Sequence, residues 1–272
     1  MATTADYLTQ LQADKQTLVD NLVAKGVEAS NDETFTTLAP KVADISSGVT
    51  VTKGVRMDAY DEDGFVTEVS ILGLTELPSG YFQGKTAGNS YSTFSQNVQK
   101  INILSNITKI GTSALGYHRK MTEINIPDTV TEMGNYALNY AEALKSLVLP
   151  QSLQILGEWT FQYLGVTELV IPSGVTVIPA SCIRNCSNLK KVVLEGDITN
   201  IGNMAFYYDM KLQTFIMPNI TTIPVIGSSV FQSSSLSSDG IYVPDNLLED
   251  FKIATNWSTY ADQIKPISEL EE

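Results

Sequence analysis

The sequence is poor in several residue types that would point to particular chemistry. Its 272 residues include one histidine and two cysteines. A single histidine gives little basis for a catalytic triad or a metal cluster, and two cysteines cannot build a disulfide framework. Basic residues number 17 against 30 acidic ones, which gives a net charge of -13. Because an acidic chain repels phosphate backbones, nucleic acid is not an expected partner.

Signals for export, membrane insertion and catalysis are also missing. No apolar run approaches the ~18 residues of a membrane span, and the first residues, MATTADYLTQ, lack the basic start and apolar stretch of a signal peptide. There is no phosphate-binding glycine loop, paired acid constellation or nucleophile elbow. We therefore expect a protein without enzymatic activity, cofactor or metal site, made in the cytoplasm without export or membrane insertion.

The sequence does contain a repeated phrase of the form apolar-x-x-apolar-x-apolar, usually followed by Pro. It occurs at VTEVSIL (66–72), VQKINIL (98–104), MTEINIP (121–127), LKSLVLP (144–150), VTELVIP (166–172), LKKVVLE (189–195), LQTFIMP (212–218) and, more weakly, SDGIYVP (238–244). The last apolar residue recurs at steps of 23, 23, 22, 23 and 23 in Ile103, Ile126, Leu149, Ile171, Leu194 and Met217. This period predicts a solenoid whose units bury their apolar faces against neighbours.

The alternation inside each phrase predicts a strand. Leu147 and Leu149 are expected to point inward, whereas Ser146 and Val148 point outward. Eight such strands would stack into one parallel sheet. The longer step from Ile71 to Ile103 holds an insertion, GKTAGNSYSTF, which we expect to form a surface loop.

A second apolar pattern follows each predicted strand. It consists of two apolar residues three apart, then Gly or Pro, which turns the chain. The pairs are Val130/Met133, Leu153/Leu156, Val175/Ile178, Ile198/Ile201 and Ile220/Ile223, and the turning residues are Gly134, Gly157, Pro179, Gly202 and Pro224. A small and then a large residue, as in Ala137-Leu138, predict a single helical turn before the next strand.

Two segments flank the repeats. The stretch 54–72 predicts two strands around an Asp-Gly turn, the first capping the N-terminal end of the stack. At the other end, a last strand precedes Asp245, which is expected to cap a short amphipathic helix through Phe251. The expected domains are a helical segment (1–48), an N-terminal β cap (49–65), the solenoid (66–240), and a C-terminal cap with an acidic tail (241–272).

The segment 1–48 does not repeat and predicts a helical hairpin. Its apolar positions follow heptad spacing in the first helix and helical spacing in the second: Leu8, Leu11, Leu18, Leu22, Phe35, Leu38, Val42 and Ile45. Gly26 separates the two helices, and Pro40 kinks or restarts the second. Three readings stay open: packing on its own chain, self-association as a dimer or trimer, and docking to another protein.

The repeats resemble the BspA-like class of leucine-rich repeats. The resemblance rests on IPDTVTEMGNYAL, IPSGVTVIPASCIRNCSNL and ITNIGNMAFYYDMKL and covers roughly residues 66–267. It implies an α/β leucine-rich-repeat solenoid, right-handed, with a parallel sheet and a C-terminal closing unit. A surface adhesin of this class would carry a signal peptide, and the chain departs from that expectation.

Residues 7–45 resemble the N-terminal segment of structural proteins in phages of Gram-positive bacteria. This second resemblance implies a virion location for the protein. It also implies that residues 1–48 anchor the chain to other virion proteins and that the solenoid is displayed. A homo-oligomer is expected, with a trimer favoured.

Two columns of repeated side chains are candidate binding surfaces. The outward strand position holds Asn102, Asn125, Val148, Val170, Val193, Ile216 and Tyr242. This run of β-branched residues reflects either strand propensity or a contact patch. On the other side of the repeat, Tyr117, Tyr140, Tyr163 and Tyr208 share one slot with Asn185, and Tyr136 and Trp159 share another. Stacked aromatics suit glycan or protein partners, or simply seal the repeats.

Three further features suggest chemistry but have simpler interpretations. Asp61 and Asp63 lack the remaining ligands of a calcium loop, so we interpret them as part of a hairpin turn. Cys182 and Cys186 lack the other ligands that zinc needs and are expected to be buried or half-buried free thiols. His118 falls in the same slot as Cys186, which favours a packing role.

Taken together, these features predict a non-enzymatic phage virion structural protein, either a head or tail fibre or a decoration protein. Its solenoid would adhere to a host-surface protein or glycan. The alternative is a bacterial leucine-rich-repeat binding module or adhesin without virion attachment.

Overall fold

The computed structural model describes residue 15 and residues 54–62, 66–82, 85–86, 90–91, 97–236 and 240–270. The chain divides into two compact units, Met1–Thr52 and Lys53–Glu272. The helical hairpin predicted for 1–48, with all eight of its apolar positions, lies outside the described residues. The Asp63-Gly64 turn and most of the insertion after residue 83 also lie outside them.

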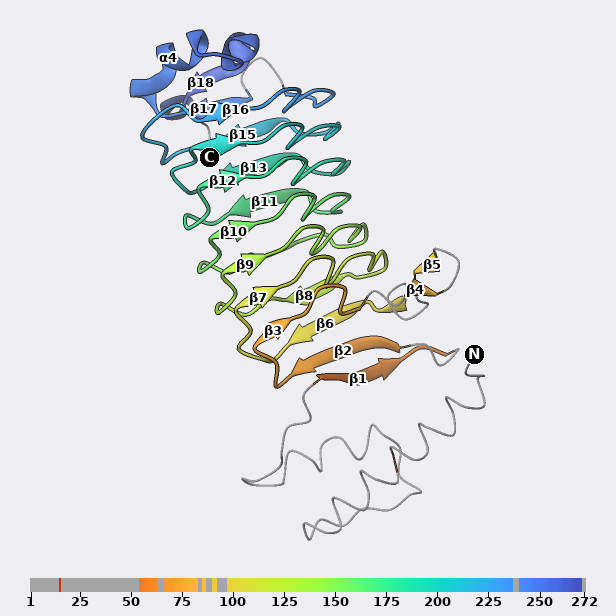
Figure 1. Ribbon diagram of the computed structural model, residues 1–272. Helices are drawn as coiled ribbons and strands as arrows, with labels where there is room; N and C mark the ends of the chain where they lie inside the picture. Colours follow the sequence, from red (N-terminus) through yellow and green to blue (C-terminus); the bar gives the residue numbers. More distant parts are fainter. Residues whose placement is uncertain are drawn as a thin grey trace. The chain divides into compact units, whose positions relative to one another are not determined.

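The second unit is a stack of coils in which most repeats supply one longer and one shorter strand, and these pair in parallel with their equivalents in neighbouring coils (Figure 1). The longer strands are β1 (Gly54–Tyr60), β2 (Val66–Leu72), β6 (Lys100–Ile103), β8 (Glu123–Asn125), β11 (Glu168–Ile171), β13 (Lys191–Leu194), β15 (Thr214–Ile216), β17 (Ile241–Val243) and β18 (Ile264–Pro266). They pair in the orders β1-β2-β6-β8 and β11-β13-β15-β17-β18. We call these the long-strand sheets.

A second set of two-residue strands, not foreseen from the sequence, lies on another side of each coil. These strands are β3 (Glu76–Leu77), β7 (Lys109–Ile110), β9 (Glu132–Met133), β10 (Ile155–Leu156), β12 (Val177–Ile178), β14 (Asn200–Ile201) and β16 (Val225–Ile226). They pair in the orders β10-β9-β7-β3 and β12-β14-β16, which we call the short-strand sheets. The insertion contributes a separate antiparallel pair, β4 (Lys85–Thr86) and β5 (Ser90–Tyr91).

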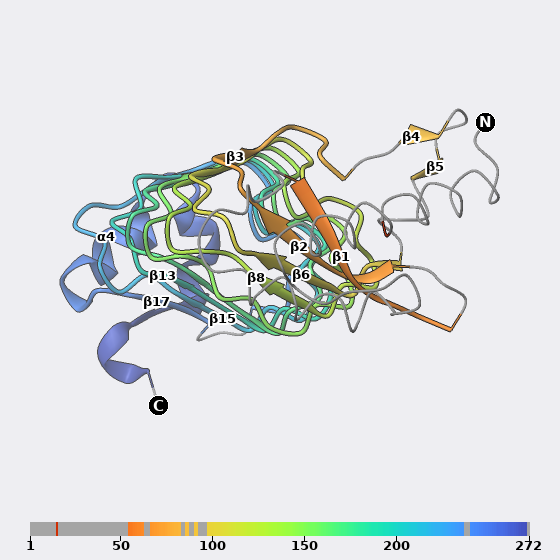
Figure 2. The ribbon, with the colours of Figure 1, turned by 90° about the horizontal axis from the view of Figure 1, so that it is seen from below.

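The pairing register reproduces the sequence period. Ile101 pairs with Ile124, and Val192 with Phe215, so each residue faces its equivalent one repeat later. The inward positions form one continuous apolar core in which Leu169, Val192 and Phe215 are fully buried. Seen along the stack, the coils superpose around this common interior (Figure 2). The predicted solenoid is therefore confirmed.

The third side of each coil is a six-residue turn instead of the predicted helical turn. In the turn 112–117, the amides of Ser113, Leu115 and Tyr117 donate to carbonyls of the next coil at 2.8–2.9 Å, whereas those of Ala114 and Gly116 donate three residues back. A helix cannot form because every second amide points to a neighbouring coil. Between residues 98 and 236 the chain has strands and turns but no helix, so the expected α/β repeat is a β-solenoid.

The turns repeat this hydrogen-bond pattern from coil to coil, and we call the result the turn ladder. It comprises residues 112–117, 135–140, 158–163, 180–185, 203–208 and 228–233. The amides of Tyr140, Tyr163 and Tyr208 each donate to the following coil at 2.8, 3.1 and 3.0 Å. The turn ladder thus holds neighbouring coils together independently of the two sheets.

The strand predicted for 144–150 does not form, which corrects the expectation of one sheet of eight strands. The backbone groups of Lys145–Leu149 make no hydrogen bond within the described part of the chain, although β8 precedes them and β11 follows. The short-strand sheets are interrupted at the same repeat, because β10 pairs with β9 but not with β12. This is the repeat that is 22 residues long.

The short strand of the last repeat lies three residues later than the sequence prediction. Ile226, not Ile223, pairs with Ile201 and is buried. Gly227, not Pro224, then turns the chain. The step from Ile201 to Ile226 is 25 residues, two more than the 23-residue period, whereas the prediction took a step of 22.

Both ends of the stack are closed by non-repeating structure. As predicted, β1 pairs antiparallel with β2 at the N-terminal edge of the long-strand sheet. At the C-terminal end, β17 is followed by η1 (Asp245–Leu247), α4 (Leu248–Ile253), η2 (Trp257–Gln263), β18 and η3 (Ile267–Glu269). Trp257 is fully buried, packs edge-on against Phe251 at 4.9 Å, and donates from Nε1 to the Pro224 carbonyl at 2.7 Å.

The predicted helix cap at Asp245 is wrong. Neither η1 nor α4 has a side-chain cap, and the Asp245 carboxylate instead accepts the amide of Ser268 at 3.1 Å. Hydrogen bonds from the side chain and then from the amide of Ser268 lower the pKa of Asp245. The contact with Ser268 ties the start of the C-terminal cap to its end, next to the pairing of β17 with β18.

A charge ladder along the long-strand sheets has a gap at the interrupted coil. Lys100 lies 3.6 Å from Glu68 and 3.3 Å from Glu123, and Lys191 lies 3.1 Å from Glu168. Ser146 occupies the same repeat slot between Glu123 and Glu168. Two carboxylates thus flank a neutral position where the pattern calls for a cation.

We predict that Ser146→Lys stabilises the protein by about 0.5–1 kcal/mol, because an ammonium group between two carboxylates continues the ladder, at the modest value of exposed ion pairs. Urea unfolding at low ionic strength measures the gain, which 1 M salt should remove. Ser146→Met, of similar length without charge, is the matched control. An equal gain in both variants would show that packing, not charge, is responsible.

Candidate functional site

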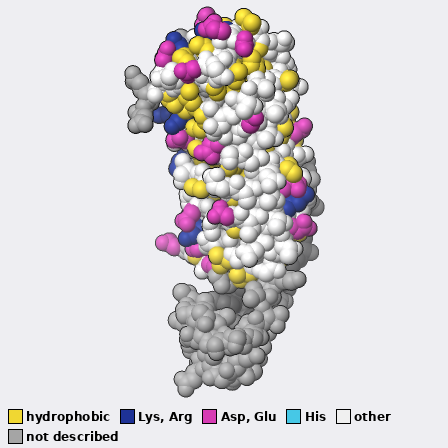
Figure 3. Space-filling model, turned by 90° about the vertical axis from the view of Figure 1, so that its left-hand side faces the viewer, with side chains coloured by type: hydrophobic (Ala, Val, Ile, Leu, Met, Phe, Trp, Pro, Cys, Tyr) yellow, Lys and Arg dark blue, Asp and Glu magenta, His cyan; other side chains and the backbone are white. Residues whose placement is uncertain are grey.

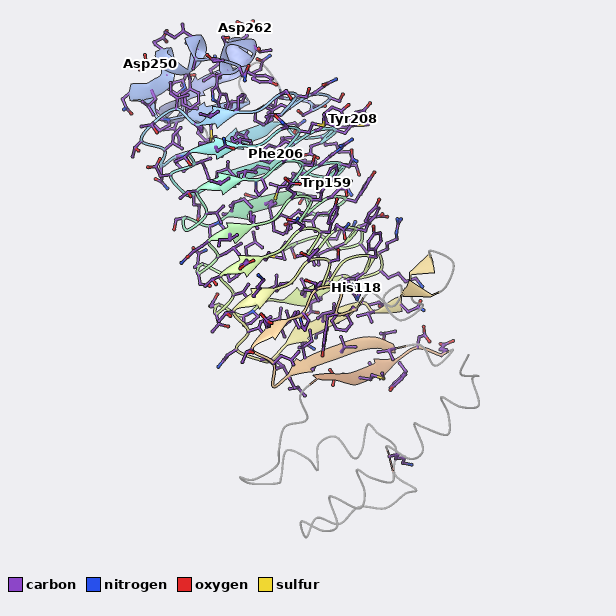
Figure 4. All side chains as sticks on the ribbon, in the orientation of Figure 1. His118, Trp159, Phe206, Tyr208, Asp250 and Asp262 are labelled. Atoms are coloured by element: carbon purple, nitrogen blue, oxygen red, sulfur yellow. The ribbon has the colours of Figure 1, made fainter. Side chains whose placement is uncertain are left out.

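Aromatic rings stack along the turn ladder, as the sequence columns indicated. The ring centroids of Tyr117 and Tyr140 are 4.7 Å apart with planes at 16°, and those of Tyr140 and Tyr163 are 4.5 Å apart at 23°. Tyr136 and Trp159 stack less closely, at 6.0 Å. We call the slot that holds Tyr117, Tyr140, Tyr163, Asn185 and Tyr208 the tyrosine column. Figure 4 shows that Trp159 and Tyr208 lie on the turn side of the stack.

The backbone under these rings is left-handed. Tyr140 has φ 60°, Tyr163 φ 58° and Asn185 φ 62°, and Trp159 has φ 61°. This conformation costs a residue with a Cβ roughly 1–2 kcal/mol. The inter-coil hydrogen bonds of the turn ladder require it, and stacking between rings of successive coils offsets part of the cost. The column is therefore held rigidly by its own backbone.

Two arginines are placed over the rings. The Arg119 guanidinium carbon lies 4.6 Å from the Tyr140 centroid, and Arg119 also pairs with Glu142 at 2.9 Å. Arg184 lies 5.2 Å from the Trp159 centroid and 4.7 Å from that of Tyr207. Burial, then the neighbouring Tyr163 and Tyr117 hydroxyls, raise the pKa of Tyr140. The column is thus an ordered, partly covered surface with polar edges.

The stacking ends where Asn185 enters the column. Tyr208, one coil further on, has the same backbone conformation but contacts Tyr207 at 4.6 Å with planes at 54°. It is 40% exposed. The sequence correctly placed Tyr208 in the slot, but the slot does not bring its ring into the stack of the other three.

The outward strand column is only partly a surface. Val148, on the interrupted coil, is 84% exposed, whereas Val170, Val193 and Tyr242 are half-buried. Ile216 was expected on the exposed face and is 4% exposed, so that expectation is wrong. A groove of about 570 Å³ runs beside β8, lined by residues 122–128 on one side and by Ser146, Val148, Leu149 and Pro150 on the other.

A second exposed apolar row escaped the sequence analysis. Ile155, Val177 and Val225 are 55%, 45% and 67% exposed, and each begins a two-residue strand of the short-strand sheets. Ile155 and Val177 are one repeat apart, and Val225 follows two repeats later with Asn200 in the slot between, so the sequence period could have revealed the row. On the face shown in Figure 3, charged side chains are scattered along the stack and hydrophobic ones gather over the C-terminal cap.

The titratable residues of the core are buried and bond to backbone groups of the coils around them. His118 is fully buried, with Nδ1 3.0 Å from the Leu115 carbonyl and its ring edge-on to Phe82 at 5.4 Å, which confirms the packing role. Burial lowers its pKa to about 4. Figure 4 labels His118 within the coils and Phe206 among the core side chains.

Cys182 and Cys186 are buried free thiols, as predicted. Burial raises the pKa of Cys182 to about 12 and that of Cys186 well above its usual value. The sequence analysis missed Asp209, which is also fully buried; its carboxylate accepts the Cys186 amide at 2.7 Å, and burial raises its pKa. Within the described residues no three metal-ligating side chains come together, and no helix is long and apolar enough to cross a membrane.

We predict that His118 makes the fold acid-sensitive. Because its folded pKa of about 4 lies below the unfolded value of ~6.5, the unfolded chain binds the proton first, and stability falls as the pH drops through this interval. The free energy of unfolding in urea is measured for wild type and His118→Leu at pH 7.5 and 4.5. Between these two pH values it should fall by on the order of 2–3 kcal/mol more in wild type than in the variant. Equal losses would contradict this.

We also predict that neither thiol reacts with Ellman's reagent at pH 8 in the folded protein. The thiolate is the nucleophile, and burial both blocks access and raises the thiol pKa. Both thiols should react within minutes in 8 M urea. Ser146→Cys, exposed on the surface, is the positive control for the folded state; rapid labelling of the wild type would show that the core opens.

Comparison with known protein families identifies the type of repeat. The family model described as "BspA type Leucine rich repeat region" matches six copies, over residues 77–144 and 108–237, which is more than half of the chain. Comparison with the curated proteins finds no significant relative.

Three solved structures are similar to this chain. The first is a leucine-rich-repeat protein of T. pallidum, 20% identical, with a TM-score of 0.48 over 58% of this chain and 77% of that one. Leucine-rich-repeat proteins from Bacteroides ovatus and Eubacterium ventriosum are 24% and 18% identical, with TM-scores of 0.49 and 0.48 over 72% and 66% of this chain. This chain spans 59% and 62% of the length of these last two. On the family match, the chain belongs to the BspA-type leucine-rich-repeat proteins.

Proposed function

We propose that this chain is a non-enzymatic phage virion structural protein, a head or tail fibre or decoration protein. Its solenoid is displayed for adhesion to a host-surface protein or glycan. The observation that carries the adhesive part is the tyrosine column. Rings stacked at 4.5–4.7 Å on a left-handed, hydrogen-bonded backbone form a rigid, partly exposed surface that core packing does not require.

The distribution of buried groups supports adhesion over catalysis. The interior is filled by aliphatic and aromatic side chains, and the buried His118, Cys182 and Asp209 belong to coils of the core. The raised thiol and carboxyl pKa values favour neutral, unreactive forms. The chain's family of repeat solenoids is typically non-catalytic. The outer surface of the coils is therefore what remains for recognition.

Virion attachment rests on the N-terminal segment. Residues 7–45 resemble segments of phage structural proteins, and we assign residues 1–48 to binding other virion proteins and to a homo-oligomer, with a trimer favoured. An oligomer on a particle presents many copies of one surface. Weak individual contacts then sum to firm attachment, because later contacts form at high effective concentration.

A bacterial adhesin or binding module without virion attachment is the second candidate. The family match favours this second candidate, because the match covers residues 77–237 and is independent of the N-terminal segment. Both candidates use the same solenoid surface. They differ in what residues 1–48 bind.

Deletion of residues 1–48 tests the assignment. The full chain and the deletion variant are each expressed with an affinity tag in cells that produce the phage, and purified particles are probed for the tag by immunoblot and by labelled electron microscopy. We expect the full chain on the particles and at least a tenfold loss for the deletion variant, because the anchor is gone.

A full-length Tyr163→Ala variant is the control and should be incorporated as the wild type is. Incorporation of the deletion variant at wild-type level would refute anchoring by this segment. Absence of the full chain from particles, combined with binding to bacterial cells, would select the second candidate.

A further inference from the structure

A hollow of about 360 Å³ opens on the turn side, next to the point where the stacking ends. It lies within the size range of small-molecule sites, roughly 300–1,000 Å³. Its lining includes Glu142 from one coil, Tyr163 and Gly165 from the next, and Asn185, Ser187 and Asn188 from the third. Three successive coils thus contribute to one concave site.

The hollow originates in the 22-residue repeat. Four positions separate Tyr140 from Leu144 and Asn185 from Leu189, but only three separate Tyr163 from Val166. The short loop is drawn inward, and a Cβ at Gly165 would lie 2.0 Å from the Glu142 carbonyl oxygen. The loops on either side keep full length and form the rims. One missing residue therefore leaves a notch in an otherwise even surface.

One face of an aromatic ring borders this notch. Tyr163 stacks on Tyr140 on one side. On its other side the column continues with Asn185, which has no ring, and Tyr163 has no second ring contact within the described residues. The backbone of Asn185 is left-handed like that of the tyrosines. The column therefore lacks a ring at Asn185 but keeps the same backbone conformation there.

The polar groups around the ring are neutral and available. The side chains of Asn185 and Ser187 make no hydrogen bond within the described part of the chain, and Asn188 Oδ1 accepts from Lys211 at 3.2 Å, which leaves its amide N–H groups. The only charged lining group is Glu142, whose carboxylate is paired with Arg119 at 2.9 Å. Among the described residues, no cationic side chain lines the hollow to bind an anion, and its neutral groups offer both donors and acceptors.

We propose that this hollow binds one neutral monosaccharide unit, a hexose or an N-acetylhexosamine, of a cell-surface glycan. The apolar C–H face of the sugar ring stacks on Tyr163, and its hydroxyl groups bond to Asn185, Ser187 and Asn188. The inference rests on the proposed adhesive function, because it names the ligand class and the place of contact. It does not depend on virion attachment.

Saturation-transfer NMR on the full chain tests the site. The probes are the methyl glycosides of glucose, galactose, mannose and N-acetylglucosamine, and the methyl glycoside of N-acetylneuraminic acid, with its free carboxylate, is the anionic comparison. We expect saturation of ring protons in at least one neutral glycoside and none in the anionic sugar. The affinity of that glycoside is then measured by titration.

The decisive variant is Asn185→Tyr. The φ of 62° at Asn185 matches the 58–67° of the tyrosines in the column, so the new ring continues the stack and covers the free face of Tyr163. We expect at least a tenfold loss of affinity with an unchanged circular dichroism spectrum. An Ala inserted after Gly165, which restores the 23-residue step, should fill the notch and have the same effect.

Tyr60→Ala removes an exposed ring from β1, outside the tyrosine column, and should bind within twofold of wild type. Wild-type affinity in Asn185→Tyr, failure of every neutral glycoside to bind, or binding of the anionic sugar alone would each overturn the assignment. Cell adhesion is measured in parallel. If wild type adheres to cells but binds no glycoside, the sugar site fails while the adhesive function stands; if wild type does not adhere, the adhesive function fails.

Discussion

Hydrogen bonding between equivalent positions of successive coils is the constraint on which the whole structure depends. On up to three sides of a coil, backbone amides and carbonyls bond to those one repeat away, so an added or missing residue must be accommodated locally. Apolar side chains then occupy the interior, because it is the only region that every coil shares. The same constraint explains why Tyr140 and Tyr163 adopt a left-handed backbone: their amides must reach the next coil.

Much of the fold was predictable from the sequence because its cause is periodic. The inward positions, the antiparallel β1 and the buried thiols follow from alternation and from slot comparison. The six-residue turns were not predictable, since propensity gives no reason to place Tyr or Trp at positive φ; only inter-coil hydrogen bonds do. The missing strand at 144–150 was also beyond reach, because LKSLVLP satisfies the pattern as well as any other copy.

The surface columns were predictable in membership but not in exposure. Ile216 and Val148 occupy equivalent slots, yet one is buried and the other, at the interruption of the sheet, is 84% exposed. The cause of the hollow beside Tyr163, a repeat one residue shorter than its neighbours, is visible in the sequence. Whether that shortening forms a hollow depends on Gly165 packing against Glu142 and on Asn185 lacking a ring.

The repeat that carries Val148 interrupts both kinds of sheet, whereas the turn ladder passes through it: Leu138 donates to Thr160, and Phe161 to Cys182. Within the described residues, the stack therefore consists of two blocks that main-chain hydrogen bonds join only along the turn ladder. Bending about the turn ladder would open the boundary between the coil that carries Val148 and the coil that begins with β11, without breaking a sheet hydrogen bond. A stack built in this way has a preferred direction of flexure.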